Sequence, residues 1–216
     1  MKVVLITGTM GAGKSKSVID DYLEGCLADE YEKGGVDLFK HYTEIRSGSY
    51  IKSRAYDNKR FPCSMVDDNV DFLKTGKKYI VIEEFHAFKA ETIDRLIGSM
   101  EQNGIELLIL SGLKYYASGD IWPTYGIVKD SCRRHGVDFE EKVTFYGKCE
   151  YPGCNNYAVN HKLSSENERK LQQGLFVFSQ ATLQDYQFFC EKCFQNVNGK
   201  RDNSLYLTQY TNQKDK

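Results

Sequence analysis

The sequence predicts an α/β fold, in which helices flank a mostly parallel sheet, followed by a small domain that carries cysteines. Strand-like apolar runs alternate with helical patterns over the first two thirds of the chain, which favours a parallel sheet. This alternation stops near residue 141, where aromatic residues become frequent and cysteines appear in close pairs. We therefore expect one domain at residues 1–141, a second at 142–197, and a polar, disordered tail at 198–216.

Residues 2–32 predict the first strand, loop and helix. Lys2–Thr7 contains a continuous apolar run, which is typical of a buried parallel strand. Apolar residues recur at helical spacing over residues 16–32. Between them, residues 8–15 read GTMGAGKS and match the pattern G-x-x-x-x-G-K-[ST]. In this context the pattern predicts a phosphate loop (P-loop) that binds a nucleoside triphosphate, and a glycine turn followed by a lysine is the simpler alternative.

The phosphate loop is expected to contact the triphosphate through backbone N–H groups at the N-terminus of the following helix. Lys14 is expected to contact the β- and γ-phosphates, and Ser15 to place its hydroxyl on Mg²⁺. ATP and Mg²⁺ are therefore the expected cofactors. The residues of this loop expected to bind them are Gly8, Thr9, Met10, Gly11, Ala12, Gly13, Lys14 and Ser15.

Shorter patterns predict the elements that follow. Val36–His41 is expected to form a second strand, and Asp67–Leu73 a short helix. Tyr42–Pro62 lacks helical periodicity and carries arginines among small and polar residues, so it is interpreted as a mobile loop. Ile105–Leu110 is a further buried strand, and residues 90–102 before it are expected to form a helix.

Two adjacent carboxylates, Glu83 and Glu84, follow another predicted strand, Lys78–Ile82. Ligands of parallel sheets bind at the carboxyl ends of the strands, where these two residues fall. Neighbouring side chains in an extended segment point to opposite sides. One carboxylate can then face Mg²⁺, while the other faces a second substrate and accepts the proton of a hydroxyl nucleophile. The alternative is a pair of exposed acids at the end of a strand.

Four of the seven cysteines form two close pairs, Cys149-x4-Cys154 and Cys190-x2-Cys193. Two pairs joined by a long connection suit a tetrahedral Zn²⁺ site in which every ligand is a thiolate. Because four thiolates leave no open position, the expected role of the zinc is structural. His161 is a competing ligand without a paired partner, and four unrelated cysteines are the alternative.

Composition argues against several classes of protein. The 216 residues carry a formal net charge of −1, which gives no electrostatic reason to expect nucleic-acid or membrane binding. No stretch approaches the roughly 20 apolar residues of a membrane span. The odd number of cysteines argues against a disulfide framework. The short N-terminal apolar run does not fit a signal peptide, so a cytoplasmic protein is expected.

The order of these motifs over residues 2–194 resembles that of the type II thymidine kinases, which combine an α/β phosphate-loop domain with a small zinc domain. In that family an arginine stands near the start of a flexible loop and a Ser-Arg pair follows it. Arg46 and Ser53-Arg54 match these positions. The family's Asp-Glu-x-Gln-Phe-Phe segment corresponds to residues 83–88, and its Gly-Leu-Asp strand end to residues 112–114.

This resemblance implies an ATP-dependent deoxynucleoside kinase that transfers the γ-phosphate to the 5′-hydroxyl of thymidine or a related pyrimidine deoxynucleoside, in nucleoside salvage for DNA synthesis. It also implies a homo-oligomer, either a dimer or a tetramer. A long loop of the zinc domain, the lasso at about residues 175–182, would close over the nucleoside.

The resemblance also assigns residues. Glu84 would be the base and Arg54 would neutralise the transferring phosphate, with Arg46 and Glu83 on the ATP–Mg²⁺ side. The nucleoside contacts would be His86, Phe88, Leu113, Trp122 and Tyr186. The zinc ligands would be Cys149, Cys154, Cys190 and Cys193.

Most departures from the family pattern lie on the nucleoside side. His86 stands for Gln and Ala87 for a Phe that packs in the nucleoside site, whereas Glu83 stands for the usual Asp. The first cysteine pair also encloses four residues instead of two. Two other functions stay open: a catalytically altered nucleotide-binding sensor (a pseudokinase), and an ATPase that uses a zinc ribbon to bind nucleic acid. The lack of a basic stripe over residues 142–194 argues against the second.

Overall fold

The computed structural model describes residues 1–44, 47–72, 76–116, 120–145, 147–175 and 182–198. Contacts divide the chain into two units. The first unit comprises residues 1–7, 13–113 and 122–143, and the second comprises residues 8–12, 114–121 and 144 onward. The domain boundary predicted after residue 141 falls inside a strand of the first unit.

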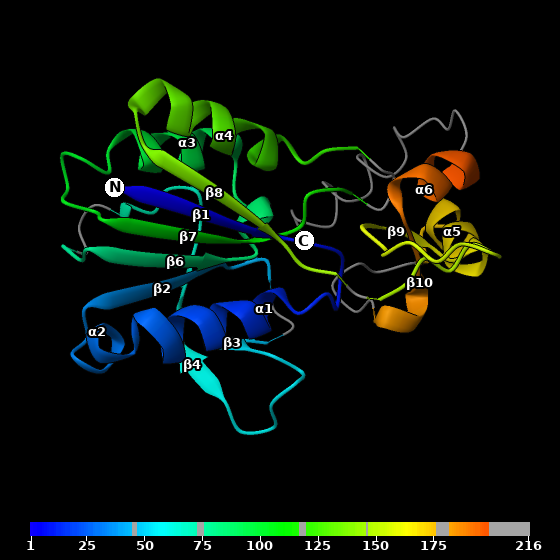
Figure 1. Ribbon diagram of the computed structural model, residues 1–216, viewed down its shortest axis with the longest axis horizontal. Coiled ribbons are helices and arrows are strands. Elements are labelled where there is room, and N and C mark those ends of the chain that lie inside the picture. The colour runs from blue at the N-terminus through cyan, green and yellow to red at the C-terminus, as the bar shows by residue number, and fades with distance from the viewer. Residues whose placement is uncertain (45–46, 73–75, 117–119, 146, 176–181, 199–216) are drawn as a thin grey trace. The chain divides into compact units, whose positions relative to one another are not determined.

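The first unit contains a six-stranded sheet in the order β5-β2-β6-β7-β1-β8, and every neighbouring pair is parallel (Figure 1). The strands are β1 (Lys2–Thr7), β2 (Val36–His41), β5 (Ser64–Val66), β6 (Tyr79–Glu83), β7 (Leu107–Gly112) and β8 (Asp138–Val143). Together with the helices on its faces, this sheet confirms the predicted α/β fold with a parallel sheet.

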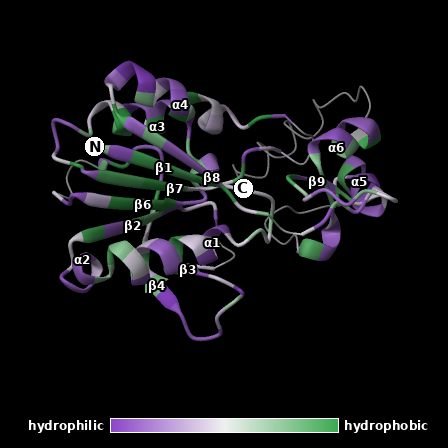
Figure 2. Ribbon diagram, in the orientation of Figure 1, coloured by the Kyte–Doolittle hydropathy of each residue, from purple (hydrophilic) through white to green (hydrophobic). Residues whose placement is uncertain are grey.

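Helices cover both faces of the sheet. One face carries α1 (Lys14–Ser17), η1 (Val18–Cys26) and α2 (Ala28–Glu32), and the other carries α3 (Ala90–Gly98) and α4 (Pro123–His135) (Figure 1). The central strands are therefore buried on both sides, and Figure 2 shows them as the most hydrophobic part of this unit. Burial on both sides explains why these strands read as unbroken apolar runs.

The helix expected over residues 16–32 is divided into three segments. η1 is a π-helix with non-helical dihedral angles at Gly25, φ −101° and ψ −118°. A Cβ atom at Gly25 would lie 2.7 Å from the carbonyl oxygen of Asp20, so only glycine fits there. The predicted helix over residues 90–102 is shorter than expected, since α3 ends at Gly98 and a turn follows.

The expectation of an irregular loop over Tyr42–Pro62 is wrong for its second half. β3 (Tyr50–Lys52) and β4 (Arg60–Pro62) form an antiparallel hairpin. Ile51 is fully buried, and the Tyr56 hydroxyl donates a hydrogen bond of 2.6 Å to the Asp20 carboxylate. An ion pair between Lys59 and Glu24 adds a second link between this hairpin and η1.

The short helix expected over Asp67–Leu73 is absent from residues 67–71, where the chain makes a turn. The Asp68 carboxylate accepts hydrogen bonds from the backbone N–H of Lys89, at 2.6 Å, and from the Thr92 hydroxyl, at 3.1 Å. The turn therefore supplies acceptors to the first residues of α3, instead of forming a helix itself.

The second unit is built around an antiparallel pair of strands, β9 (Asn160–Leu163) and β10 (Tyr186–Phe189). The remaining elements are α5 (Ser165–Gln172), the 3₁₀ turn η5 (Leu183–Asp185) and α6 (Glu191–Asn198). Ser164 caps α5, because its side chain accepts a hydrogen bond from the backbone N–H of Asn167. Among the described residues of both units, no helix has the length and apolar character needed to cross a membrane.

Candidate functional site

Three buried polar side chains form a row across the carboxyl edge of the sheet. Glu83 ends β6, and the parallel register places it beside Lys40 on β2 and Ser111 on β7. Residues in register on parallel strands project from the same face. In this row that face is the one covered by η1, because Val81 and Ile109, two residues earlier on β6 and β7, pack against it. We call Lys40, Glu83 and Ser111 the edge row.

The first turn of α1 contacts this row. The Ser15 hydroxyl donates a hydrogen bond to Oε1 of Glu83. The preceding residue, Lys14, is buried. Gly13, immediately before α1, has a φ of +83°, a left-handed conformation that favours glycine. The structure thus brings together two residues that the sequence predicted to act on the same metal ion, Ser15 and Glu83.

Burial, together with the neighbouring charge of Glu84, raises the pKa of Glu83 to about 7. Three groups oppose this rise: Lys40, Ser15 and Lys14. Nζ of Lys40 lies 3.9 Å from Oε2 of Glu83, and only 2% of the lysine side chain is exposed. The same ammonium donates a hydrogen bond to Ser47.

Sequence reasoning missed Lys40. Its signal was a lysine near the end of the predicted strand Val36–His41, because a strand buried on both faces leaves a charge little access to water. A lysine in that position needs a buried partner, and the acidic end of the neighbouring strand supplies it.

Glu84 adopts a left-handed backbone conformation, φ 54° and ψ 42°, and no other described residue except glycine has a positive φ. For a non-glycine residue this conformation stores strain, which is often found at functional sites. The chain then turns through η3 (Phe85–Ala87). A Cβ atom at Gly112 would lie 2.7 Å from Phe85 and 2.8 Å from His86, so this turn packs directly on a glycine of β7.

His86 is buried beside Glu84. Its Nδ1 accepts a hydrogen bond of 3.1 Å from the backbone N–H of Leu113, so Nδ1 carries no proton. The 3.5 Å contact between this nitrogen and Oε2 of Glu84 is therefore not an ion pair. The His86 ring also packs edge-on against Trp122, with 4.8 Å between ring centroids. Three of the predicted nucleoside contacts thus lie together: His86, Leu113 and Trp122.

The other predicted nucleoside contacts lie elsewhere. Phe88 belongs to the core, where its ring packs against those of His41 and Phe72. Tyr186 is on β10 of the second unit, and its ring packs against His161 at 5.2 Å. Most of the predicted lasso lies outside the described residues.

The structure describes one of the two predicted arginines. Arg54 is exposed in the hairpin between β3 and β4. Arg46 lies outside the described residues.

The first five residues of the predicted phosphate loop, Gly8–Ala12, belong to the second unit. At Gly8, a Cβ atom would lie 2.4 Å from Oγ1 and 2.6 Å from the carbonyl oxygen of Thr144. Gly11 has a φ of +72°, and the backbone N–H of Ala12 donates a hydrogen bond of 3.3 Å to the carbonyl oxygen of Thr9. Met10 and Ala12 are buried, together with Thr9. Glycine is therefore required at Gly8 by close packing and favoured at Gly11 by its backbone conformation.

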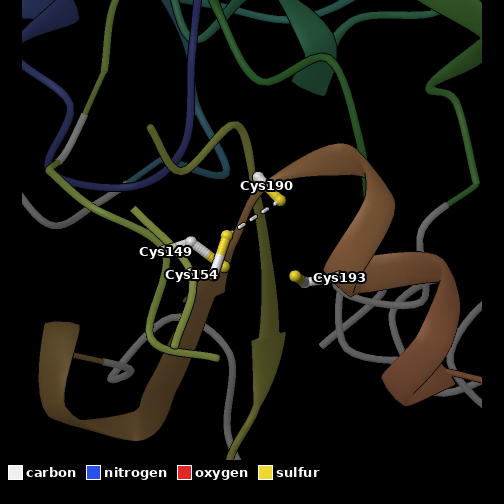
Figure 3. Close-up of side chains that lie close together, drawn as sticks. All are labelled: Cys149, Cys154, Cys190 and Cys193. Atoms are coloured by element: carbon white, nitrogen blue, oxygen red, sulfur yellow. Dashed lines mark hydrogen bonds between the residues drawn. The ribbon is translucent and has the colours of Figure 1, made fainter. Parts of the chain in front are cut away.

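The four cysteines of the predicted zinc site lie together in the second unit, with all four sulfur atoms within 4.8 Å of one another (Figure 3). The sulfurs of Cys154 and Cys190 are 3.8 Å apart, the separation that two thiolates have in a tetrahedral site with Zn–S bonds of about 2.3 Å. Cys149 and Cys190 are buried, as is Cys193. The four side chains could therefore hold a metal ion such as zinc.

Local structure brings the cysteine pairs together. Residues 148–157 fold back on themselves through an antiparallel bridge between Lys148 and Tyr157, which accommodates the longer spacing of the first pair. Cys190 follows β10, and Cys193 lies in the first turn of α6. The backbone N–H of Cys193 lowers the pKa of Cys190 to about 7, whereas burial raises the pKa of Cys193.

No family model matches the chain, and no curated protein matches it either.

Proposed function

We propose that this protein is an ATP-dependent deoxynucleoside kinase that transfers the γ-phosphate of ATP to the 5′-hydroxyl of thymidine or a related pyrimidine deoxynucleoside. The observation that carries the proposal is the hydrogen bond from Ser15 to Glu83. It joins the hydroxyl of the G-x-x-x-x-G-K-S motif to a carboxylate at the end of a neighbouring parallel strand, the arrangement in which phosphate-loop proteins hold Mg²⁺.

The chemistry of these donors fits Mg²⁺, which prefers oxygen ligands and keeps several of its water molecules. The Ser15 hydroxyl and the Glu83 carboxylate are such ligands, and Lys14 supplies positive charge for the phosphates. A bound Mg²⁺ would neutralise charge on the triphosphate. Lys40 holds Glu83 in place from the opposite side of the carboxylate.

Glu84 is proposed to accept the proton of the acceptor hydroxyl. Its left-handed backbone turns the chain immediately after Glu83, at the end of β6. The two carboxylates can then serve the metal and the acceptor separately. Arg54 is proposed to approach the phosphate when substrates bind, and Arg46 to assist on the ATP side.

His86, Leu113 and Trp122 are proposed to contact the nucleoside base, with Phe88 supporting them from the core. His86 carries its proton on Nε2, because Nδ1 accepts the backbone N–H of Leu113. A histidine with this tautomer presents an N–H donor, as a glutamine side-chain amide also does. The four cysteines are proposed to bind a structural Zn²⁺ that stabilises the second unit.

The experiment that tests this proposal is a transfer assay. The purified, zinc-loaded protein is incubated with labelled ATP, Mg²⁺ and a panel of pyrimidine nucleosides and nucleoside monophosphates. Lys14→Ala is the inactive control, and Lys33→Ala, at an exposed lysine, is the matched control that should stay active. We expect labelled 5′-monophosphate from at least one pyrimidine deoxynucleoside.

Other outcomes point to other functions. ATP binding without transfer to any acceptor would contradict the kinase proposal and favour a nucleotide-binding sensor. ATP hydrolysis stimulated by nucleic acid would favour the zinc-ribbon ATPase.

A further inference from the structure

Ser111, the third residue of the edge row, has no role in the function proposed above. It lies on β7 in register with Glu83 on one side and Ile6 on the other. Only 1% of Ser111 is exposed. Because its side chain projects from the same face as that of Glu83, its hydroxyl lies on the side of the sheet where α1 begins.

The Ser111 hydroxyl is buried, and within the part of the chain that the structure describes it has no hydrogen-bond partner. Most buried polar groups in proteins have such a partner, because burying a hydroxyl without one costs free energy. A ligand that forms a hydrogen bond with this hydroxyl would compensate that cost when it binds. The row continues from Ser111 to the charged side chains of Glu83 and Lys40, and the Ser15 hydroxyl of α1 donates a hydrogen bond to Glu83.

We infer that Ser111 is a further Mg²⁺-site residue, whose hydroxyl acts with Glu83 to hold a water molecule of the hydrated metal when nucleotide binds. This inference rests on the proposed nucleotide-binding function. A hydroxyl suits the role because it both donates and accepts hydrogen bonds. Mg²⁺ retains several water molecules in proteins, and these waters need acceptors in fixed positions.

The chain offers a matched control at Ser131 on α4. This serine is also fully buried, and its hydroxyl also lacks a hydrogen-bond partner among the described residues. Its neighbours Val128 and Cys132 belong to the apolar cluster on the opposite face of the sheet. Ser131→Ala therefore makes the same chemical change at equal burial, outside the proposed metal site.

The test measures the dissociation constant of ATP by calorimetry over a range of Mg²⁺ concentrations, together with the melting temperature of the ligand-free protein. Removing an unpartnered buried hydroxyl should leave the melting temperature of both variants unchanged or higher. In Ser111→Ala, ATP affinity without Mg²⁺ should equal that of the wild type, and the gain in affinity caused by Mg²⁺ should fall roughly three- to tenfold. Ser131→Ala should keep the full gain, and Ser111→Thr, which retains a hydroxyl, should recover most of it.

Two results would overturn the inference, and they differ. If the wild type binds ATP more tightly with Mg²⁺ and Ser111→Ala keeps the full gain, the role of Ser111 fails while the proposed function stands. If the wild type shows no ATP binding at any Mg²⁺ concentration, both fail together.

Discussion

The two candidate sites of this protein are assembled in different ways. The edge row is set by the register of parallel strands, so residues from three strands meet wherever the sheet forms. Its two buried charged side chains, Lys40 and Glu83, oppose each other, and the Ser15 hydroxyl donates a hydrogen bond to Glu83. The cysteine cluster instead joins a short bridged segment to the first turn of α6, in a unit whose sheet has two strands.

This difference determines whether each site needs a bound ligand in order to form. The edge row rests on a large apolar core on both faces of the sheet, so it should form without any ligand. The buried cluster around the cysteines consists of few residues, so the second unit should depend on a bound metal.

The largest expected effect follows removal of the proposed metal ion from the second unit. Chelation of zinc, or Cys190→Ser, should destabilise this unit by an amount on the order of 10 kcal/mol, because metal binding and folding are coupled in such sites. Hydrogen exchange followed by mass spectrometry should show lost protection in β9 and β10, and retained protection in β6 and β7. Full protection of β9 and β10 in metal-free protein would contradict the expectation that the second unit depends on a bound metal. Cys26→Ser, at an exposed cysteine, is the control.

A smaller effect is expected in the first unit when Lys40 is changed. Lys40→Met leaves the buried Glu83 carboxylate without its opposing charge, which should lower the free energy of unfolding by about 3 kcal/mol at pH 8. Urea denaturation checks this value. Lys33→Met, at a lysine whose side chain is 69% exposed, should change the stability by less than about 0.5 kcal/mol. Equal effects of the two changes would show that the Lys40–Glu83 contact contributes nothing.

The pH dependence of stability should reveal the raised pKa of Glu83. The folded protein holds this proton up to about pH 7, whereas the unfolded chain releases it near the ordinary value of 4.5. Glu83 therefore contributes fully to the free energy of unfolding below pH 4.5. This contribution falls by about 3 kcal/mol as the pH rises from 4.5 to about 7.

Glu83→Gln should remove that loss, so the difference in unfolding free energy between the variant and the wild type should grow from pH 4.5 to pH 7. Urea denaturation at several pH values measures it. A constant difference across this range would contradict the assigned burial of the carboxylate.

The smallest expected effect concerns the backbone of Glu84. Glu84→Gly relieves the left-handed strain and should raise the free energy of unfolding by about 1 kcal/mol, while phosphate transfer is lost. Glu84→Gln keeps the strain, so it should lose transfer without gaining stability. A stability gain in both variants would show that the charge of Glu84, and not its backbone conformation, destabilises the folded protein.

The parts of the fold that the sequence predicted best are the strands with strong apolar patterns. β1 and β2 have the predicted bounds, and β1 is a nearly continuous apolar run that ends at a loop. β8 was missed because it is an edge strand whose side chains are mostly exposed, and the hairpin of β3 and β4 because each of its strands has three residues. Short and exposed strands leave little apolar pattern in a sequence.

The site was predicted in part for a related reason. The spacing of the glycine motif predicted Ser15, and the acidic strand end predicted Glu83. Lys40 and Ser111 join the site through strand register, which no local pattern encodes. The left-handed conformation of Glu84 likewise depends on the packing of the following turn against Gly112.

The central claim is that Ser15 and Glu83 act together on the metal ion of a bound nucleotide. A double-mutant cycle tests it most directly, with Ser15→Ala, Glu83→Gln and the double variant, and with the Mg²⁺-dependent gain in ATP affinity as the measured quantity. We predict that each single change removes most of the gain and that the double variant is no worse than Glu83→Gln. Additive losses, or a wild type whose ATP affinity does not depend on Mg²⁺, would contradict the claim.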